Sequence, residues 1–259
     1  QIYLDRCTFS EVKNCEIRDS DGELIVLRGS EDCTVAYNRT VGGSSGIATT
    51  GYIDQGLNEA YIGYRNHIYK NTVLNSRAAF MTINDRFTVI EANEVYSSDM
   101  TDAAFAGPGI RLGHSAETYP GVPASLTNYK SAVGVQVINN HIYNLTQTKP
   151  NFYPIAIAAN VTTDGSNPNP GILIDGNLIK NCETGIQVSV TSGQKGVISN
   201  NEVHTFGEGI KLFNNEGEEH DFIIRKNLIY ADVDYSSITI NNRHSTIDKN
   251  EIYALSQTT

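Results

Sequence analysis

The sequence predicts an all-β solenoid in which short strands stack coil upon coil, and three observations lead to this prediction. A motif of an apolar residue, two residues, asparagine, one residue and a second apolar residue recurs along the chain. The segments around it alternate in twos, are rich in isoleucine and valine, and are punctuated by glycine and asparagine. The 3.6-residue apolar period of helical repeats is missing. Each unit therefore predicts about three short strands joined by turns.

The motif itself indicates a buried corner that is repeated in every coil. It occurs eight times with asparagine and once with cysteine, as VKNCEI at 12–17, VAYNRT at 35–40, GYRNHI at 63–68, IEANEV at 90–95, VINNHI at 137–142, IDGNLI at 174–179, ISNNEV at 198–203, IRKNLI at 224–229 and IDKNEI at 247–252. Asparagine tolerates the left-handed backbone of a tight corner, and its amide can bond to the same residue one coil away. We expect a ladder of asparagine amides, with Cys15 in the corresponding slot.

This repeat, together with segments such as GIRL at 109–112, GIQV at 185–188 and GIKL at 209–212, resembles the right-handed parallel β-helix of the pectate-lyase-like superfamily. The resemblance covers nearly the whole chain and implies one domain, residues 1–259, of about nine to ten coils with an asparagine ladder. The superfamily includes polysaccharide lyases, glycoside hydrolases, uronate epimerases and trimeric phage tailspikes. The signature motifs of polygalacturonases, pectate lyases and alginate epimerases are absent from the sequence, so the reaction stays open.

Composition excludes several classes of function. A formal charge of −10 and a pI near 5.0 argue against nucleic-acid binding. No run of about 20 apolar residues predicts a membrane span, and the first residues do not form a signal peptide. The four cysteines form no CxxC pair and are expected to be free or structural. No cofactor is required by the sequence, and a calcium ion stays open. The resemblance implies an extracellular or virion-associated location.

The spacing of the motif points to one side of the solenoid. Successive key positions are 23, 28, 27, 47, 37, 24, 26 and 23 residues apart, so the extra residues fall between Asn38 and Asn177. The longest insertion is a loop at 113–132, which interrupts the segment GPGIRLGHSAETYPG. Stacked coils bring such insertions together, and loops on a rigid scaffold commonly carry binding groups. The alternative is a set of tolerated surface insertions.

Aligning the GIxL segments predicts which side chains share a face. Ile110 and Leu112 should point inward, matched by Met81 and Ile83 one coil earlier, and by Ile155 and Ile157 one coil later. The outward column would then consist of Ile25, Ala48, Thr82, Arg111, Ala156, Gln187 and Lys211. In the superfamily that the sequence resembles, substrate commonly lies along this strand face.

The end of these strands supplies the candidate catalytic residues. The alignment places Asp85 and His114 on adjacent coils, about 4.8 Å apart at the backbone, with Arg111 nearby. A histidine oriented by an aspartate is a suitable general base, and an arginine can neutralise a carboxylate or an oxyanion. The trio suits either proton abstraction beside a uronate carboxylate or hydrolysis of a glycosidic bond. The alternative is a solvated charge network. The expected substrate-binding residues are Arg28, Arg86, Glu117 and Tyr119.

A tyrosine stripe and the two chain ends complete the expectations. Five tyrosines follow the motif asparagine by three residues and should line the exterior, namely Tyr69, Tyr96, Tyr143, Tyr230 and Tyr253. They would form same-face stacks, a subunit interface or a sugar platform. No cap is visible at either end, which suggests a segment of a longer chain, a partner or homo-oligomerisation, for example as a trimer. The leading hypothesis is a polysaccharide lyase or glycoside hydrolase. Its alternative is a non-catalytic receptor-binding or structural segment of a tailspike or adhesin.

Overall fold

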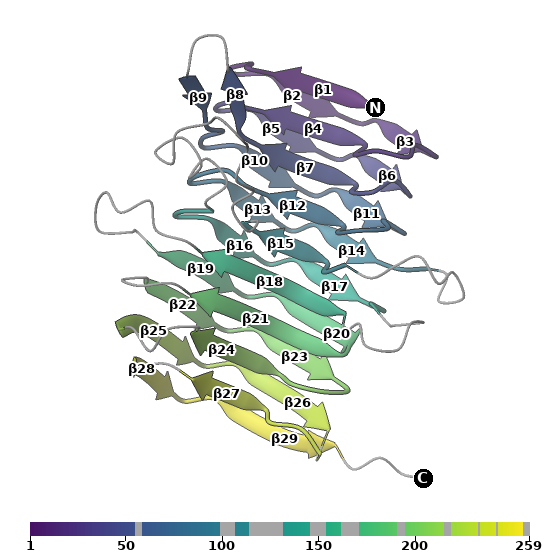
Figure 1. Cartoon of the computed structure of the whole chain (residues 1–259). Coiled ribbons are helices and arrows are strands. Elements are labelled where there is room, and N and C mark those ends of the chain that lie inside the picture. Colours follow the sequence, from purple (N-terminus) through teal and green to yellow (C-terminus); the bar gives the residue numbers. More distant parts are fainter. Residues whose placement is uncertain are drawn as a thin grey trace.

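A computed structural model describes residues 1–54, 59–98, 107–113, 132–145, 154–161, 171–190, 195–214, 219–232, 234–241 and 243–255. These residues form a right-handed parallel β-helix with three parallel sheets of nine strands each, one strand per sheet from every coil (Figure 1). The all-β solenoid predicted from the sequence is confirmed. In the described part of the chain, no helix has the length and hydropathy of a membrane-spanning segment.

Each sheet takes every third element of the coil. The first sheet contains β1 (Ile2–Asp5), β4 (Ile25–Arg28), β7 (Ile47–Thr50), β12 (Met81–Ile83), β15 (Ile110–Leu112), β18 (Ile155–Val161), β21 (Thr184–Val190), β24 (Ile210–Asn214) and β27 (Ile238–Asn241). The second contains β2 (Glu11–Lys13), β5 (Thr34–Ala36), β10 (His67–Tyr69), β13 (Val89–Glu91), β16 (Gln136–Ile138), β19 (Ile172–Asp175), β22 (Lys195–Ser199), β25 (Glu219–Arg225) and β28 (Arg243–Asp248).

The third sheet contains β3 (Glu16–Arg18), β6 (Arg39–Val41), β11 (Thr72–Leu74), β14 (Glu94–Tyr96), β17 (His141–Tyr143), β20 (Leu178–Cys182), β23 (Glu202–Thr205), β26 (Leu228–Asp232) and β29 (Glu251–Leu255). A short antiparallel pair, β8 (Tyr52–Asp54) and β9 (Glu59–Tyr61), extends from the third coil. Apolar side chains alternate inward along every sheet and fill the interior, as at Ile68, Ile90 and Ile142, which are 0% exposed.

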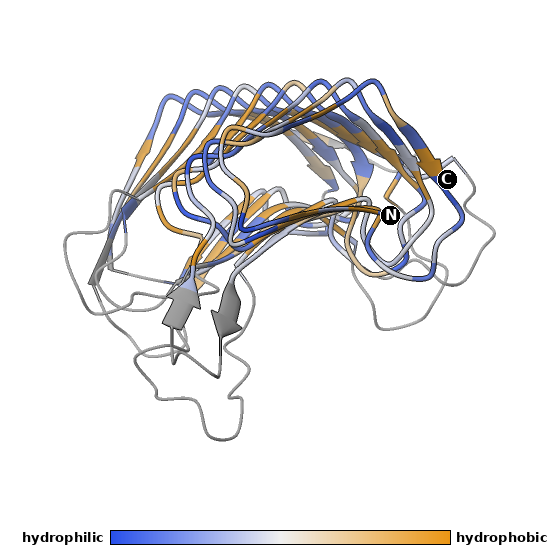
Figure 2. Ribbon diagram, turned by 90° about the horizontal axis from the view of Figure 1, so that it is seen from above, coloured by the Kyte–Doolittle hydropathy of each residue, from blue (hydrophilic) through white to orange (hydrophobic). Residues whose placement is uncertain are grey.

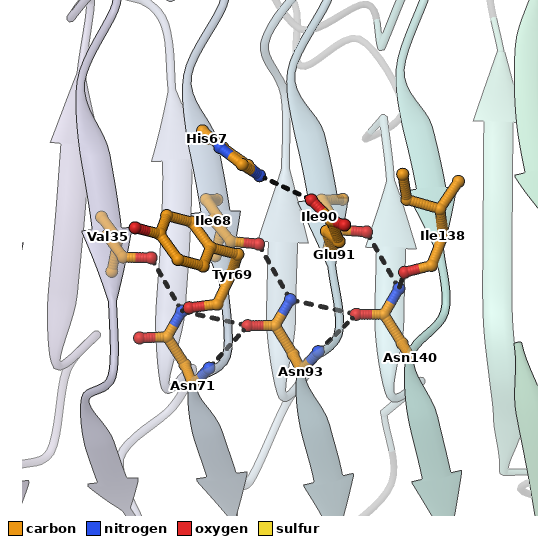
Figure 3. Close-up of polar contacts among 10 residues, drawn as sticks. All are labelled: Val35, His67, Ile68, Tyr69, Asn71, Ile90, Glu91, Asn93, Ile138 and Asn140. Atoms are coloured by element: carbon orange, nitrogen blue, oxygen red, sulfur yellow. Dashed lines mark hydrogen bonds and ion pairs between the residues drawn. The ribbon is translucent and has the colours of Figure 1, made fainter.

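The corner between the second and third sheets holds the predicted ladder. Its rungs are Asn38, Asn71, Asn93, Asn140, Asn177, Asn201, Asn227 and Asn250. From one rung to the next, the side-chain Nδ2 donates to the following Oδ1 at 2.9–3.0 Å, as Figure 3 shows for Asn71, Asn93 and Asn140. In the first coil, the Cys15 backbone N–H donates to Asn38 Oδ1 at 3.0 Å.

Two details of the predicted ladder are wrong. Asn71, not Asn66, is the rung between Asn38 and Asn93, because Ile68 pairs with Val35 in the second sheet and the corner therefore follows residue 69. The left-handed residue is also not the rung itself. It is the residue before it in every coil, namely Asn14, Tyr37, Lys70, Ala92, Asn139, Gly176, Asn200, Lys226 and Lys249. This residue turns the chain, so the rung side chain is left free to point inward.

The register of the first sheet confirms one half of the predicted alignment and corrects the other. Ile110 and Leu112 pair with Met81 and Ile83 as expected. One coil later, however, Ile110 pairs with Ile157 rather than Ile155. The physical reason is the column of small residues that precedes these strands. A Cβ at Gly109 would lie 2.9 Å from the interior Ile142 side chain, and Ala156 rather than a larger residue follows it in the next coil.

The first sheet differs from the others in how it is joined to its neighbours. Every second-to-third-sheet connection is two residues long, whereas longer connections begin or end at a strand of the first sheet, as at 97–109 and 113–135. Seen from above, the first sheet lies opposite the two-residue corners (Figure 2). The predicted insertion loop at 113–132 follows β15, and most of it lies outside the described residues.

Candidate functional site

The outer face of the first sheet carries a continuous column of matched side chains. The column consists of Tyr3, Val26, Ala48, Thr82, Arg111, Ala158, Gln187, Lys211 and Thr239. The predicted outward positions of Thr82, Arg111, Gln187 and Lys211 are therefore confirmed. The prediction is wrong at two positions of the column, which are occupied by Val26 instead of Ile25 and by Ala158 instead of Ala156. The side chains of Ile25 and Ala156 face inward and are fully buried. From Thr82 onward the column is half-buried and more polar than the first rungs.

A pocket of about 340 Å³ opens on this face over β21 and β24. Its lining consists of Glu183, Thr184, Gln187, Gly207, Glu208, Lys211 and Tyr235. Glu183 immediately precedes β21, and Glu208 lies two residues before β24. A Cβ on Gly207 would lie 2.7 Å from the Glu183 backbone oxygen, so glycine lets the two turns pack closely at this point. The register of adjacent coils thus brings two carboxyl groups into one pocket.

The two carboxyl groups stand in different electrostatic surroundings. Burial raises the pKa of Glu183 above its ordinary value. Glu208 instead accepts a 2.7 Å hydrogen bond from Lys211 Nζ, and Thr239 Oγ1 donates to its other oxygen at 3.4 Å. An ammonium at this distance balances the carboxylate charge. One pocket therefore contains a carboxyl group that retains its proton more readily and a carboxylate held by a cation, which is an arrangement suited to acid–base chemistry.

The predicted catalytic residue Asp85 lies inside the solenoid. Its side chain is 0% exposed and accepts hydrogen bonds from Asn66 Nδ2 at 2.7 Å and from Thr88 Oγ1 at 3.4 Å. A side chain at Gly63 would collide with the Asp85 carboxylate. Burial raises the pKa of Asp85 to about 7. The predicted outward placement is wrong, because Ile83 faces inward and the two-residue alternation turns residue 85 inward as well.

The predicted arginines are placed separately from one another. Arg111 lies on the outer column, and burial lowers the pKa of its guanidinium. Arg28 forms two hydrogen bonds with the Asp5 carboxylate, at 2.8 and 2.9 Å, which lower the pKa of Asp5. Arg86 forms a parallel bridge with Tyr64 beside the second sheet. Arg28 and Arg111 both lie on the outer face of the first sheet, but Arg28 is paired with Asp5 near the first coil, whereas Arg111 is three strands away from Lys211 along the column.

The remaining predicted site residues, His114, Glu117 and Tyr119, lie outside the described residues, and their roles stay predictions. Within the described part of the chain, no three His, Cys, Asp or Glu side chains are grouped so as to hold a metal ion. The sequence analysis missed Glu183 and Glu208. A signal was available, because ETGIQV and EGIKL each place a glutamate one or two residues before the glycine of a repeated GIxL-type segment.

The predicted tyrosine stripe is largely confirmed on the outer face of the third sheet. Tyr96 and Tyr143 stack with ring centroids 4.7 Å apart, and Tyr230 stacks between His204 and Tyr253 at 4.3 and 5.0 Å. Tyr69 does not belong to the stripe, because it lies in the second sheet. The rings cover one another's faces, so a sugar would meet mainly their edges.

Comparison with known proteins supports the fold. No family model matches the sequence, and no curated protein matches it. Among solved structures, the tailspike protein of E. coli bacteriophage HK620 in complex with a pentasaccharide is similar, with a TM-score of 0.57, 13% identity, and coverage of 96% of this chain and 46% of the tailspike. The periplasmic alginate epimerase AlgG gives a TM-score of 0.59 and 12% identity, with 95% of this chain and 55% of the epimerase covered.

These similarities agree with the architecture described above. The chain has a right-handed parallel β-helix fold. It spans about half the length of the structures that it matches. At 12–13% identity, the likeness establishes the fold alone.

Proposed function

We propose that this protein binds a polysaccharide along the outer face of the first sheet and hydrolyses a glycosidic bond in the pocket that contains Glu183 and Glu208. The observation that carries the proposal is the contrast between these two carboxyl groups, one with a raised pKa and one paired with Lys211 at 2.7 Å. Glycoside hydrolysis needs such a pair, because one group protonates the leaving oxygen while the other acts as base or nucleophile. Glu183 is the acid and Glu208 the base or nucleophile.

The charges in the pocket favour a neutral or amino sugar over a uronate. Two carboxyl groups face one ammonium there, and that ammonium is already paired with Glu208. A lyase or uronate epimerase would need a cation available to the substrate carboxylate, since proton abstraction beside an ionised carboxylate is otherwise unfavourable. The chain also carries a net charge of −10, which repels polyanions at long range. Hydrolysis is therefore favoured over elimination.

The column beside the pocket supplies further binding positions. Gln187 lines the pocket, and Arg111 lies two strands away on the same column, a separation of about 10 Å. Tyr235 lines the opposite side and is 53% exposed, so its ring is available to a sugar. The tailspike that shares this fold was solved with a pentasaccharide. This supports an extended glycan as the ligand, met outside the cell or at a virion surface.

The test is a cleavage assay with the purified chain on neutral, amino-sugar and uronic polysaccharides. New reducing ends are measured in parallel with the absorbance of unsaturated uronates. We expect reducing ends without unsaturated products, and a loss of roughly 100-fold or more in Glu183→Gln and Glu208→Gln. Glu202→Gln, on the third sheet, is the matched control and should retain full activity. Unsaturated products, or full activity in both pocket variants, would contradict the proposal.

The alternative function is a non-catalytic receptor-binding or structural segment, and the tyrosine stripe favours it. Stacked rings at Tyr96–Tyr143 and Tyr230–Tyr253 cover an outer face that also suits packing against another subunit, for example in a trimer. The same assay separates the two functions. Glycan binding with no reducing ends in any substrate, combined with an assembly that dissociates in Tyr143→Ala, would favour the structural role.

A further inference from the structure

Arg111 is a half-buried charge on the outer column of the first sheet. Within the described part of the chain, its side chain has no hydrogen bond or ion pair. Its column neighbours are Thr82 in the preceding coil and Ala158 in the following one, and neither carries a charge. Burial lowers the pKa of the guanidinium, and no described carboxylate acts in the opposite direction. The desolvation of this cation is therefore not offset by a described neighbour.

Arg28 shows how the protein neutralises a guanidinium on the same face. It donates two hydrogen bonds, at 2.8 and 2.9 Å, to the carboxylate of Asp5 in the neighbouring coil. Arg65 likewise donates two hydrogen bonds to Asp32 across coils, at 2.6 and 2.8 Å. A carboxylate one coil away is thus a recurrent partner for arginine in this solenoid. Arg111 departs from that arrangement, because the matched positions on both sides are uncharged.

The position of Arg111 relative to the pocket suits one glycan bound to both. Ala158 is the only column residue between Arg111 and Gln187, and its side chain extends no further than Cβ. The guanidinium and the amide are therefore separated by two strand spacings, or about 10 Å, with no long column side chain between them. Gln187 lines the pocket, and it too has no hydrogen-bond partner among the described residues. Two unpaired polar groups thus flank a stretch of the column beside the pocket.

The chemistry of the guanidinium selects the group that would bind there. It carries only donors, arranged in a planar fork that matches the two oxygens of a carboxylate. A sugar hydroxyl would accept a hydrogen bond but would leave the charge uncompensated. An anionic substituent compensates the charge and forms the stronger, charge-assisted hydrogen bonds. On a glycan such a substituent is a carboxylate or a sulfate ester, and the planar fork favours the carboxylate.

We propose that Arg111 binds the carboxylate of an acidic sugar in the glycan, three strands or about 14 Å from Lys211 along the column. This inference rests on the proposed function, in which the glycan lies along the outer face of the first sheet. It narrows the substrate to a heteropolysaccharide, with a neutral or amino sugar in the pocket and a carboxylated sugar further along. At this distance, solvent and salt screen the bound carboxylate from Glu183 and Glu208.

The direct test follows the Nε–H signal of Arg111 by nuclear magnetic resonance, assigned by its loss in Arg111→Met. The probes are sodium glucuronate, glucose 6-sulfate and glucose, each titrated at constant ionic strength. We expect a saturable shift with glucuronate that persists in the control variant Arg28→Met, a weaker shift with the sulfate, and no shift with glucose. A response to glucose equal to that of glucuronate, or no response to either anion, would overturn the proposal. A stronger response to the sulfate would overturn the choice of a carboxylate.

Melting temperatures decide whether the folded chain itself neutralises Arg111. Arg28→Met should lower the Tm by a few degrees, because Asp5 loses both of its hydrogen bonds. Arg111→Met keeps an apolar side chain of similar length and removes an unpaired charge, so its Tm should equal or exceed that of the wild type. A fall as large as that of Arg28→Met would show that the guanidinium already has a partner within the protein, and the proposal would be wrong.

The polysaccharide that is cleaved in the assay described above supplies the third measurement, after its carboxyl groups have been reduced to alcohols. Carboxyl reduction and Arg111→Met should each lower kcat/KM roughly tenfold, and together should cost no more than either change alone. Multiplied losses, or a cleaved polysaccharide without carboxyl groups, would contradict the proposal. If no polysaccharide is cleaved, the hydrolytic function fails, whereas the glucuronate titration still decides whether Arg111 binds an acidic sugar.

Discussion

The two corners that flank the second sheet contain buried polar side chains in different states of hydrogen bonding. At the corner with the third sheet, each interior rung from Asn71 to Asn227 uses its amide oxygen and nitrogen in the ladder. At the corner with the first sheet, Asn66 bonds to the Ser30 carbonyl and to Asp85, but Asp85 Oδ1 is buried with no partner among the described residues.

This difference follows from the lengths of the connections at the two corners. The ladder corner is two residues long in every coil, so an amide can repeat at a fixed spacing and satisfy its neighbour. The other corner joins the first sheet through connections of varied length, so its polar residues meet in a local cluster instead of a repeat. A carboxyl group enclosed there must either keep its proton or pay the desolvation penalty of its charge.

Breaking the regular corner should have the largest effect on stability. Asn140→Ala removes the acceptor of both Asn93 donors and the donor to the Ile90 carbonyl. We expect a loss of about 3–4 kcal/mol in the free energy of unfolding, because several buried groups lose their partners together. Chemical denaturation measures it, with the exposed Gln136→Ala in the same coil as control. A cost equal to that of the control would show that the ladder does not support the fold.

The irregular corner should make stability depend on pH. The folded-state pKa of Asp85 is raised to about 7 from 3.8, so the folded protein binds this proton more readily than the unfolded chain. The stabilisation is complete below about pH 4 and is lost as the pH rises toward 7. We expect a fall of about 2–3 kcal/mol in the free energy of unfolding over this range.

The variant Asp85→Asn isolates this effect. It should remove most of the fall and make the protein more stable than the wild type at pH 8, while cleavage activity stays unchanged. Denaturation at several pH values measures the stability. A loss of activity in a folded Asp85→Asn variant would restore the catalytic role predicted from the sequence.

A smaller effect on stability is expected from substitution of Gly63, because the Asp85 carboxylate occupies the position that a side chain at residue 63 would take. Gly63→Ala should cost about 1–2 kcal/mol, since the added methyl group displaces this carboxylate. The cost should shrink when Asp85 is shortened in the double variant with Asp85→Ala, and a double-mutant cycle measures this coupling. Additive costs would mean that the two residues do not compete for one space.

The smallest effect should come from extending the ladder into the first coil. Cys15→Asn would place an amide where Cys15 already donates its backbone N–H to Asn38 Oδ1 at 3.0 Å. The new Nδ2 can bond to the same oxygen, so we expect a gain of about 0.5–1 kcal/mol. Thermal unfolding measures it, with Cys7→Ser as a control outside the ladder. A destabilised Cys15→Asn variant would indicate that the first coil does not adopt the corner geometry of the others.

The sequence by itself determined the solenoid and most of its ladder. β-branched residues in alternation and an asparagine at each corner form a local pattern, which the backbone can realise in only one way when coils stack. The motif predicted the wrong rung at Asn66. GYRNHI matches the motif, but the ladder corner comes after β10, so Asn71 is the rung. A short motif cannot distinguish two polar corners that flank the same strand.

Only the tertiary structure decided which side chains share a site. Glu183 and Glu208 are separated by a full coil in sequence, and they meet because β21 and β24 pair in one particular register. Asp85 was misplaced because the strand was expected to leave the sheet after Ile83, whereas the two-residue alternation continues and turns residue 85 into the core. Connections of varied length around the first sheet leave that register unspecified by local sequence. It is fixed by the packing of the inner column and the small residues beside it.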